Sequence, residues 1–223
     1  MKAREKTKLP DTHLIVGDIQ GSAFLEKLPP DFVGKCDKIF SNAALHWCKR
    51  DPVGVLVNAH TILKTGGLFV AEMGGHGNVS GANPSIRVTS KQAEYRFHCL
   101  GVRDALHAAL RKRGIDPVAR DPWFFPTPDQ YTELFKLADF RPISVSLHPR
   151  ATTIVDLGGW IRLFGRRFLE GIGPEEEQAI VNEVVETCRT SGAWREDGDR
   201  KSWELEYVRL RVVAVKGDSD IKS

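Results

Sequence analysis

The most constraining feature of the chain is a strand–helix–strand pattern over residues 36–73. An apolar strand at 36–40 is followed by a polar turn at 41–47, and then by a segment whose apolar residues recur with the spacing of a one-sided helix. The helix is predicted to end at a glycine C-cap, Gly66-Gly67, before a short buried strand at 68–73. Such a crossover indicates an open α/β sheet, in which ligands bind at the carboxyl ends of the strands. The turn at 41–47 is therefore the first place to look for chemistry.

Beyond this crossover, the chain continues to alternate strand and helix patterns. The helix predicted after Thr127 begins with a capping hydroxyl, a proline at the first helical position and an acid in the first turn. The other predicted elements are a strand at 13–16 that ends at Gly17-Asp18, a helix at 102–113, a strand at 142–148, helices at 160–169 and 174–189, and a terminal strand at 207–215. This alternation predicts an α/β fold.

Composition argues against several classes of function. The 223 residues are 41% apolar and 27% charged, as in ordinary globular domains, and a net charge of +3 is too small to indicate nucleic-acid or membrane binding. Cys36, Cys48, Cys99 and Cys188 lack zinc-ligand spacing, so no metal site is predicted. The first residues lack the apolar core of a secretory signal, and no apolar run approaches the ~20 residues that span a bilayer. We expect a cytoplasmic protein that acts on a small molecule, with its oligomeric state left open.

Five stretches resemble a known family. The segments CDKIFSNAALHW and LKTGGLFVAEM, with HLIVGDIQ upstream, resemble strands of class I S-adenosylmethionine-dependent methyltransferases, most closely the trans-aconitate methyltransferase-like branch. The segments DPWFFPTPDQYTELFKLADFRPISV and WELEYVRLRVVAVK resemble the last helix and the closing strands of that family. The resemblance implies a Rossmann-like α/β fold, S-adenosyl-L-methionine as the cofactor and a small-molecule substrate.

Part of the family pattern is missing from the chain. The glycine-rich turn that approaches the cofactor, and the acid that binds its ribose, have no counterpart before residue 36. The resemblance therefore implies a fold that lacks its first strands, and weak or absent binding of S-adenosylmethionine. The implied organisation is a truncated core at 1–157, a helical lid inserted at 158–200, the terminal strand at 201–216 and a disordered tail at 217–223.

Residues 80–100 have no counterpart in the resembling family, whereas Val79 joined to Gly101 would read as uninterrupted family sequence. We interpret this segment as an insertion or a retained intron. A genuine surface loop with a helix extension is the alternative.

The resemblance also implies where the cofactor binds. Asp18 would accept a hydrogen bond from the adenine amine, and Ile19 would cover the adenine face. Asn42 and Ala43 would offer backbone groups to the methionyl end, and Trp47 would close over the methyl group. Without the family, each of these is an ordinary strand-end or turn residue.

The acceptor side rests on residue chemistry as well as on the family. A hydroxyl acceptor needs a general base, for which histidine is suited, and a guanidinium offers a bidentate fork to a carboxylate. The alternatives are a structural histidine, residues without function in a glycine-rich turn for His76 and Asn78, a core aromatic residue and a solvated helix face. The residues predicted here are the catalytic candidates His46 and His76 and the substrate-binding candidates Asn78, Trp123, Arg162 and Arg166.

The predicted function is methyl transfer from S-adenosylmethionine to a small-molecule acceptor. The chain shows no Ser-His-Asp, Cys-His or paired-carboxylate signature. O-methylation of a carboxylate fits this absence, because a carboxylate attacks a methyl group without a general base and alignment alone accounts for catalysis. The alternative is a catalytically inactive fragment, or a non-enzymatic binding module that retains part of the fold.

Overall fold

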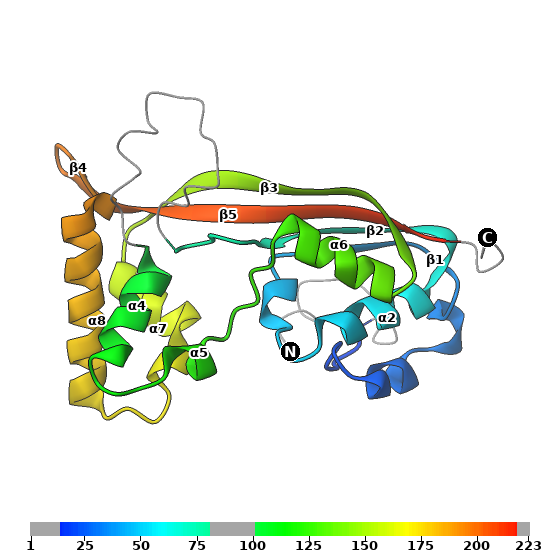
Figure 1. Cartoon of the computed structure of the whole chain (residues 1–223), viewed down its shortest axis with the longest axis horizontal. Coiled ribbons are helices and arrows are strands. Elements are labelled where there is room, and N and C mark those ends of the chain that lie inside the picture. The colour runs from blue at the N-terminus through cyan, green and yellow to red at the C-terminus, as the bar shows by residue number, and fades with distance from the viewer. Residues whose placement is uncertain (1–13, 81–100, 218–223) are drawn as a thin grey trace. The chain divides into compact units, whose positions relative to one another are not determined.

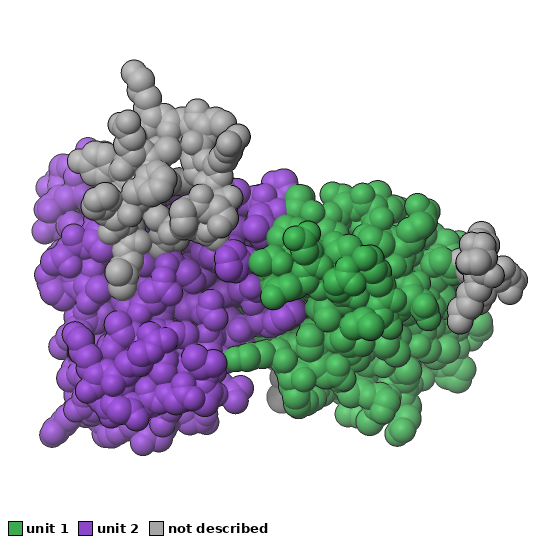
Figure 2. All heavy atoms as spheres, viewed as in Figure 1, with its two compact units in different colours: residues 1–73, 126–146, 210–223 green, residues 74–125, 147–209 purple. Residues whose placement is uncertain are grey.

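The computed structural model of the chain describes residues 14–80 and 101–217. The chain divides into two compact units, one from residues 1–73, 126–146 and 210–223 and the other from 74–125 and 147–209 (Figure 2). The strands of the described part form a sheet in the order β1-β2-β5-β3, and β4 pairs with β5. Their bounds are β1 Cys36–Asn42, β2 Leu63–Gly74, β3 Phe140–Ile154, β4 Trp194–Asp197 and β5 Arg200–Lys216. The predicted α/β class is confirmed.

The predicted crossover is present in the first unit. Helix α2 (Pro52–Ile62) joins β1 to β2, and the two strands pair in parallel. The Asp51 carboxylate accepts from the backbone N–H of Gly54 at 2.7 Å, which caps the first turn of α2. On one side of β2, α2 packs against α6 (Pro128–Leu137) (Figure 1). The buried ring of Phe69 lies 5.8 Å from that of Phe135 on α6, so this face of the crossover is the core of the first unit.

The end of α2 differs from the prediction. The helix stops at Ile62, and Gly66, with a φ of 74°, lies inside β2 where the pairing with β1 is irregular. Instead of a glycine cap, the Lys216 ammonium donates to the carbonyl oxygens of His60 and Leu63 at 2.8 and 2.9 Å. A side chain from β5 therefore satisfies carbonyl groups that the last helical turn leaves open.

The strand predicted at 13–16 is not formed. His13 lies outside the described residues, residues 14–18 have no regular structure, and Val16 is 88% exposed. Within the described part of the chain, β1 is an outer strand of the sheet and pairs only with β2. The segment at 14–16 has no ladder partner there, and an isolated extended segment leaves its backbone groups to water.

Helices α4 (Val102–Arg111), α5 (Pro117–Arg120), α7 (Leu157–Phe164) and α8 (Pro174–Cys188) belong to the second unit. The helices predicted at 102–113 and 174–189 are confirmed as α4 and α8, which pack against each other. The helix predicted at 160–169 starts earlier and breaks at Gly165, after which η5 (Arg166–Leu169) forms a separate 3-10 turn. A Cβ on Gly165 would lie 2.8 Å from the carbonyl oxygen of Ile161, so the tight break requires glycine.

The strands predicted at 142–148 and 207–215 are confirmed as parts of the longer β3 and β5. The predicted lid at 158–200 and its boundaries stay a prediction. The disordered tail predicted at 217–223 and the segment interpreted as an insertion lie, apart from Gly217 and Ser80, outside the described residues. The remaining short elements are the 3-10 helices Ser22–Lys27, Pro30–Phe32 and Leu45–Trp47 and the π-helical turn Arg189–Ala193.

Candidate functional site

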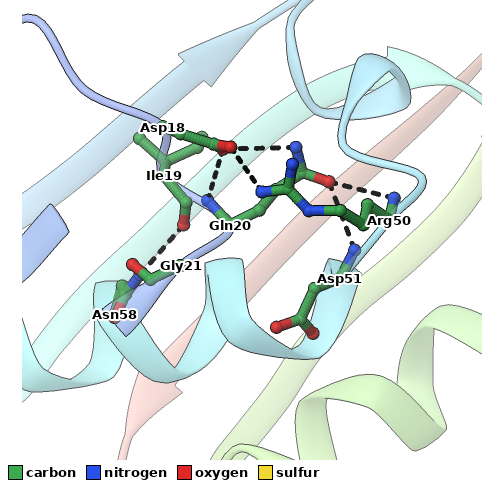
Figure 3. A network of polar contacts seen from close by, with 7 residues as sticks. All are labelled: Asp18, Ile19, Gln20, Gly21, Arg50, Asp51 and Asn58. Carbon is green, nitrogen blue, oxygen red and sulfur yellow. Dashed lines mark hydrogen bonds and ion pairs between the residues drawn. The ribbon is translucent and has the colours of Figure 1, made fainter. Parts of the chain in front are cut away.

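The turn that contains Asp18 and Ile19 is fixed against α2 by a buried amide (Figure 3). Asn58 of α2 donates through Nδ2 to the carbonyl oxygens of Ile19 and Gly21, at 2.9 and 3.0 Å. A Cβ on Gly54 would lie 2.6 Å from the carbonyl oxygen of Gln20, so the turn approaches the helix as closely as glycine allows. The turn predicted to face adenine is therefore well ordered, although the strand expected before it is absent.

The Asp18 carboxylate receives donors from two directions. Its Oδ1 accepts from the backbone N–H of Gln20 at 3.0 Å and from Gln20 Nε2 at 3.2 Å, and its Oδ2 accepts from the Arg50 guanidinium. The backbone N–H of Gln20, followed by Arg50, holds the pKa of Asp18 below its ordinary value, because both donors favour the carboxylate. The Asp18 side chain remains about half exposed, so the turn presents an ionised acceptor to solvent.

Gln20 connects this turn to the start of α2 through its side-chain oxygen. Gln20 Oε1 accepts from the backbone N–H groups of Arg50 at 2.9 Å and Asp51 at 3.2 Å. Sequence reasoning missed Gln20, Arg50 and Asn58 as parts of the site. The available signals were weak: a polar residue two positions after Asp18, and a cation just before the helix cap.

The second predicted part of the site follows β1. Asn42 and Ala43 are exposed, and the backbone N–H of Ala43 donates to the carbonyl oxygen of Glu72 at 2.8 Å. Ala43 has a φ of 53°, a left-handed conformation that is uncommon for a residue with a side chain. The turn at the carboxyl end of β1 is thus a strained backbone segment that is open to solvent.

His46 and Trp47 lie in the 3-10 helix after this turn and differ in exposure. The His46 side chain is buried, whereas Trp47 is exposed, and their ring centroids are 5.2 Å apart. The pKa of the neighbouring Cys48 thiol is raised, first by burial and then by the negative charge of Asp18. The backbone N–H of Arg50, two residues after Cys48, donates to Gln20 Oε1 at 2.9 Å, so the chain after this 3-10 helix contacts the Asp18 turn within the first unit.

The predicted acceptor residues other than His46 belong to the second unit. His76 is exposed, but Asn78 is buried and its Oδ1 accepts from the backbone N–H of Val208 at 3.0 Å. Trp123 is buried, with ring centroids 5.6 Å from Phe125 and 5.4 Å from Phe168. The contacts of Asn78 and Trp123 agree with the structural alternatives that the sequence left open.

The two predicted carboxylate-binding arginines also differ. Arg162 on α7 donates through Nε to Glu177 at 3.2 Å and through Nη2 to Gln178 at 2.7 Å, which ties α7 to α8. Arg166 is exposed in η5. The bidentate fork of Arg162 is therefore occupied by this chain's own side chains, whereas Arg166 faces solvent.

A buried ionic cluster in the second unit was not anticipated from the sequence. The Asp121 carboxylate, 2% exposed, lies 2.7 Å from Arg103 Nε and 3.2 Å from His107 Nε2, and accepts from the backbone N–H of Trp123 at 2.9 Å. Burial pushes the pKa of Asp121 upward, but these hydrogen bonds and the Arg103 charge bring it below its ordinary value. The cluster anchors α4 to the chain before Trp123 and has a structural role.

Other ligand types find less support. Among residues 14–80 and 101–217, no group of His, Cys, Asp or Glu side chains is arranged to hold a metal ion, and every helix is too short or too polar to span a bilayer. An open groove of about 740 Å³ is lined by residues 31, 32 and 35–38. This groove lies at the amino end of β1, whereas ligands of open α/β sheets bind at the carboxyl end.

Comparison with known proteins supports the resemblance seen in the sequence. No family model matches the chain. An uncharacterised methyltransferase of Schizosaccharomyces pombe is 34% identical over 184 residues, or 81% of this chain and 62% of that protein, so this chain spans less than two thirds of its relative. A candidate methyltransferase of Bacillus halodurans is 12% identical over 91% of this chain and 76% of its own, with a TM-score of 0.48. Loganic acid methyltransferase is 14% identical over 88% of this chain and 70% of its own, with a TM-score of 0.45. In its sequence, the chain is thus similar to a methyltransferase.

Proposed function

We propose that this chain carries the adenine side and the methyl side of an S-adenosyl-L-methionine site, in a protein that methylates a small-molecule acceptor. The observation that carries the proposal is the Asp18 turn. A buried amide fixes its backbone, while its ionised carboxylate stays about half exposed. A rigid turn with one outward acceptor is suited to bind a ligand amine, because little conformational freedom is lost on binding.

The residue types at the site fit this cofactor. A carboxylate accepts from an exocyclic amine, and the partly buried Ile19 next to it offers an apolar surface to an adenine ring. Asn42 and Ala43, exposed in the turn after β1, would offer backbone groups to the methionyl end. The exposed ring of Trp47 is available to cover a bound ligand and to exclude water.

The bound cofactor would supply a sulfonium methyl group as the electrophile. The residues of this chain would then act by position: Asp18 holds the adenine amine, and Asn42 and Ala43 orient the methionyl end. A carboxylate acceptor loses no proton, so proximity and alignment supply the catalysis, worth up to about 7–11 kcal/mol. For a hydroxyl acceptor, His76 is the candidate base whose side chain is exposed, whereas His46 is buried.

The acceptor class rests on the two arginines of the second unit. Arg166 is exposed and would bind the acceptor carboxylate directly. Arg162 would contribute only by exchanging Glu177 for the acceptor. O-methylation of a small carboxylic acid is the finer form of the proposal, and the trans-aconitate-like branch stays a prediction.

Ligand-observed NMR with S-adenosylhomocysteine tests the cofactor site, because it detects binding that is too weak for calorimetry. The matched pair of variants is Asp18→Asn and Asp37→Asn, since Asp37 is also an exposed aspartate paired with a basic side chain, Lys64. We expect weak binding by the wild-type chain, loss of binding in Asp18→Asn and no change in Asp37→Asn. Binding that survives Asp18→Asn would place the adenine elsewhere. No response from the wild-type chain would favour the non-enzymatic module.

A further inference from the structure

The carboxylate that the proposed function assigns to adenine is already held by a guanidinium of the same chain. We propose that Arg50 is a latch on the cofactor site, which competes with the ligand amine for the Asp18 carboxylate and weakens its binding. This inference rests on the proposed function, since it concerns the same carboxylate (Figure 3).

The two oxygens of Asp18 have separate partners, which makes the competition specific. Oδ1 accepts from both N–H donors of Gln20, at 3.0 and 3.2 Å, and these bonds lie within the turn itself. Oδ2 accepts from Arg50, which directly precedes the N-cap of α2. Oδ1 has two donors and Oδ2 has one, so Oδ2 is the oxygen that an incoming amine would use, and there it would compete with the Arg50 guanidinium.

The latch can open without disturbing the turn. The Arg50 side chain is 67% exposed, and an exposed ion pair is weak and screened by salt. The Arg50 backbone is held independently, because its N–H donates to Gln20 Oε1 at 2.9 Å. The side chain can swing into solvent while Gln20 and Asn58 keep the turn in place against α2.

The charge of Arg50 predicts how salt changes the affinity for the ligand. With Arg50 in place, the Asp18 carboxylate is neutralised and less attractive to a ligand amine. An anion that pairs with Arg50, or salt that screens the pair, frees Oδ2. We therefore expect S-adenosylhomocysteine to bind the wild-type chain more tightly at moderate ionic strength than at low ionic strength.

The test compares Arg50→Gln with Lys49→Gln, which removes the same charge one residue earlier. Binding of S-adenosylhomocysteine is measured by ligand-observed NMR at low and moderate salt, and the pKa of Asp18 by carboxyl ¹³C NMR without ligand. We expect Arg50→Gln to bind about two- to fivefold more tightly at low salt, to lose the salt effect, and to raise the pKa of Asp18. Lys49→Gln should behave like the wild type.

The possible failures are distinguishable. Equal or weaker affinity in Arg50→Gln, with binding still dependent on Asp18, would overturn the latch and leave the cofactor site standing. An unchanged Asp18 pKa in Arg50→Gln would also overturn it, because the contact would then be absent in solution. Absence of binding in the wild type and in both variants would overturn the proposed function, and the latch with it.

Discussion

Excising residues 80–100 should leave α4 and the strands intact, because the residues on either side of this segment are already in contact. The backbone N–H of Arg103 donates to the carbonyl oxygen of Val79 at 2.9 Å. Gly101, the N-cap of α4, has extended backbone angles and accepts from the N–H of Ala105. Joining Val79 directly to Gly101 changes the Val79–Arg103 bond from a long-range contact into an i to i+3 bond, which is the pattern of an ordinary β-turn.

The magnitude follows from loop closure. Residues 79 and 103 are 24 positions apart in the chain and would be three apart after the deletion. Each halving of the chain length between two contacting residues lowers the entropic cost of joining them by about 0.6 kcal/mol, so three halvings raise the free energy of unfolding by about 2 kcal/mol. The deletion also removes two hydrogen bonds of Ser80, to the carbonyl oxygens of Gly77 and Asn78, both 3.3 Å long and weak. For a chain of this size, the gain corresponds to a Tm increase of about 4–8 °C.

Urea unfolding followed by circular dichroism, with calorimetry for Tm, measures this effect in the wild-type and deleted chains. The control replaces residues 80–100 with a Gly-Ser segment of equal length, which keeps the chain length and removes the sequence. We expect the deletion to raise the free energy of unfolding, and the control to have the wild-type value within about 0.5 kcal/mol. A loss of more than about 1 kcal/mol in both variants would refute the reasoning, because it would show that the segment itself packs on the fold.

Three further predictions test the fold around the site. Ala43→Gly should raise the free energy of unfolding by about 1 kcal/mol in urea titrations, because glycine adopts the left-handed conformation without strain; a destabilised variant would contradict this. Lys216→Met should lower it by about 1–2 kcal/mol, because two carbonyl oxygens at the end of α2 lose their donor, whereas an unchanged urea midpoint would show that water replaces it. Asp121→Asn should lower the free energy of unfolding by about 2–4 kcal/mol at pH 7, because the partly buried Arg103 loses its carboxylate partner. Since the folded pKa of Asp121 lies below the unfolded one, the stability that the carboxylate contributes is complete above ~pH 3.9 and is lost as the pH falls through the folded pKa. The urea midpoints of the wild type and the variant should therefore converge in acid, and a constant difference would argue against the depressed pKa.

Elements with local determinants were predicted correctly from the sequence. At the start of α6, Thr127 Oγ1 accepts from the backbone N–H of Gln130 at 3.2 Å, and Gln130 Oε1 accepts from the backbone N–H of Thr127 at 2.9 Å. This capping box was only partly anticipated, because the threonine and the proline after it were recognised but the glutamine was not. The buried face of α4 follows its apolar periodicity. Caps and periodicity involve residues a few positions apart, so the chain itself displays them.

Several features that depend on distant partners were predicted wrongly or not at all. The segment at 14–16 has the composition of a strand, but a strand exists only where a neighbour accepts its ladder bonds. The end of α2 is satisfied by Lys216, more than 150 positions away in the chain. The buried cluster at Asp121 likewise joins that residue to Arg103 and His107 of α4, and no local sequence pattern predicts the contact.

The strand–helix–strand crossover, the likeness to methyltransferases and the placement of Asp18 in a Gly-Asp turn could be read from the sequence. The contacts of the Asp18 carboxylate could not, because they are made with residues far away in the chain. Asn58 fixes its turn from 37 and 39 positions away, and Arg50 pairs with it from 32 positions away. The physical reason is that periodicity and capping are properties of neighbouring residues, whereas hydrogen-bond partners, burial and pKa are set by groups that meet only after folding.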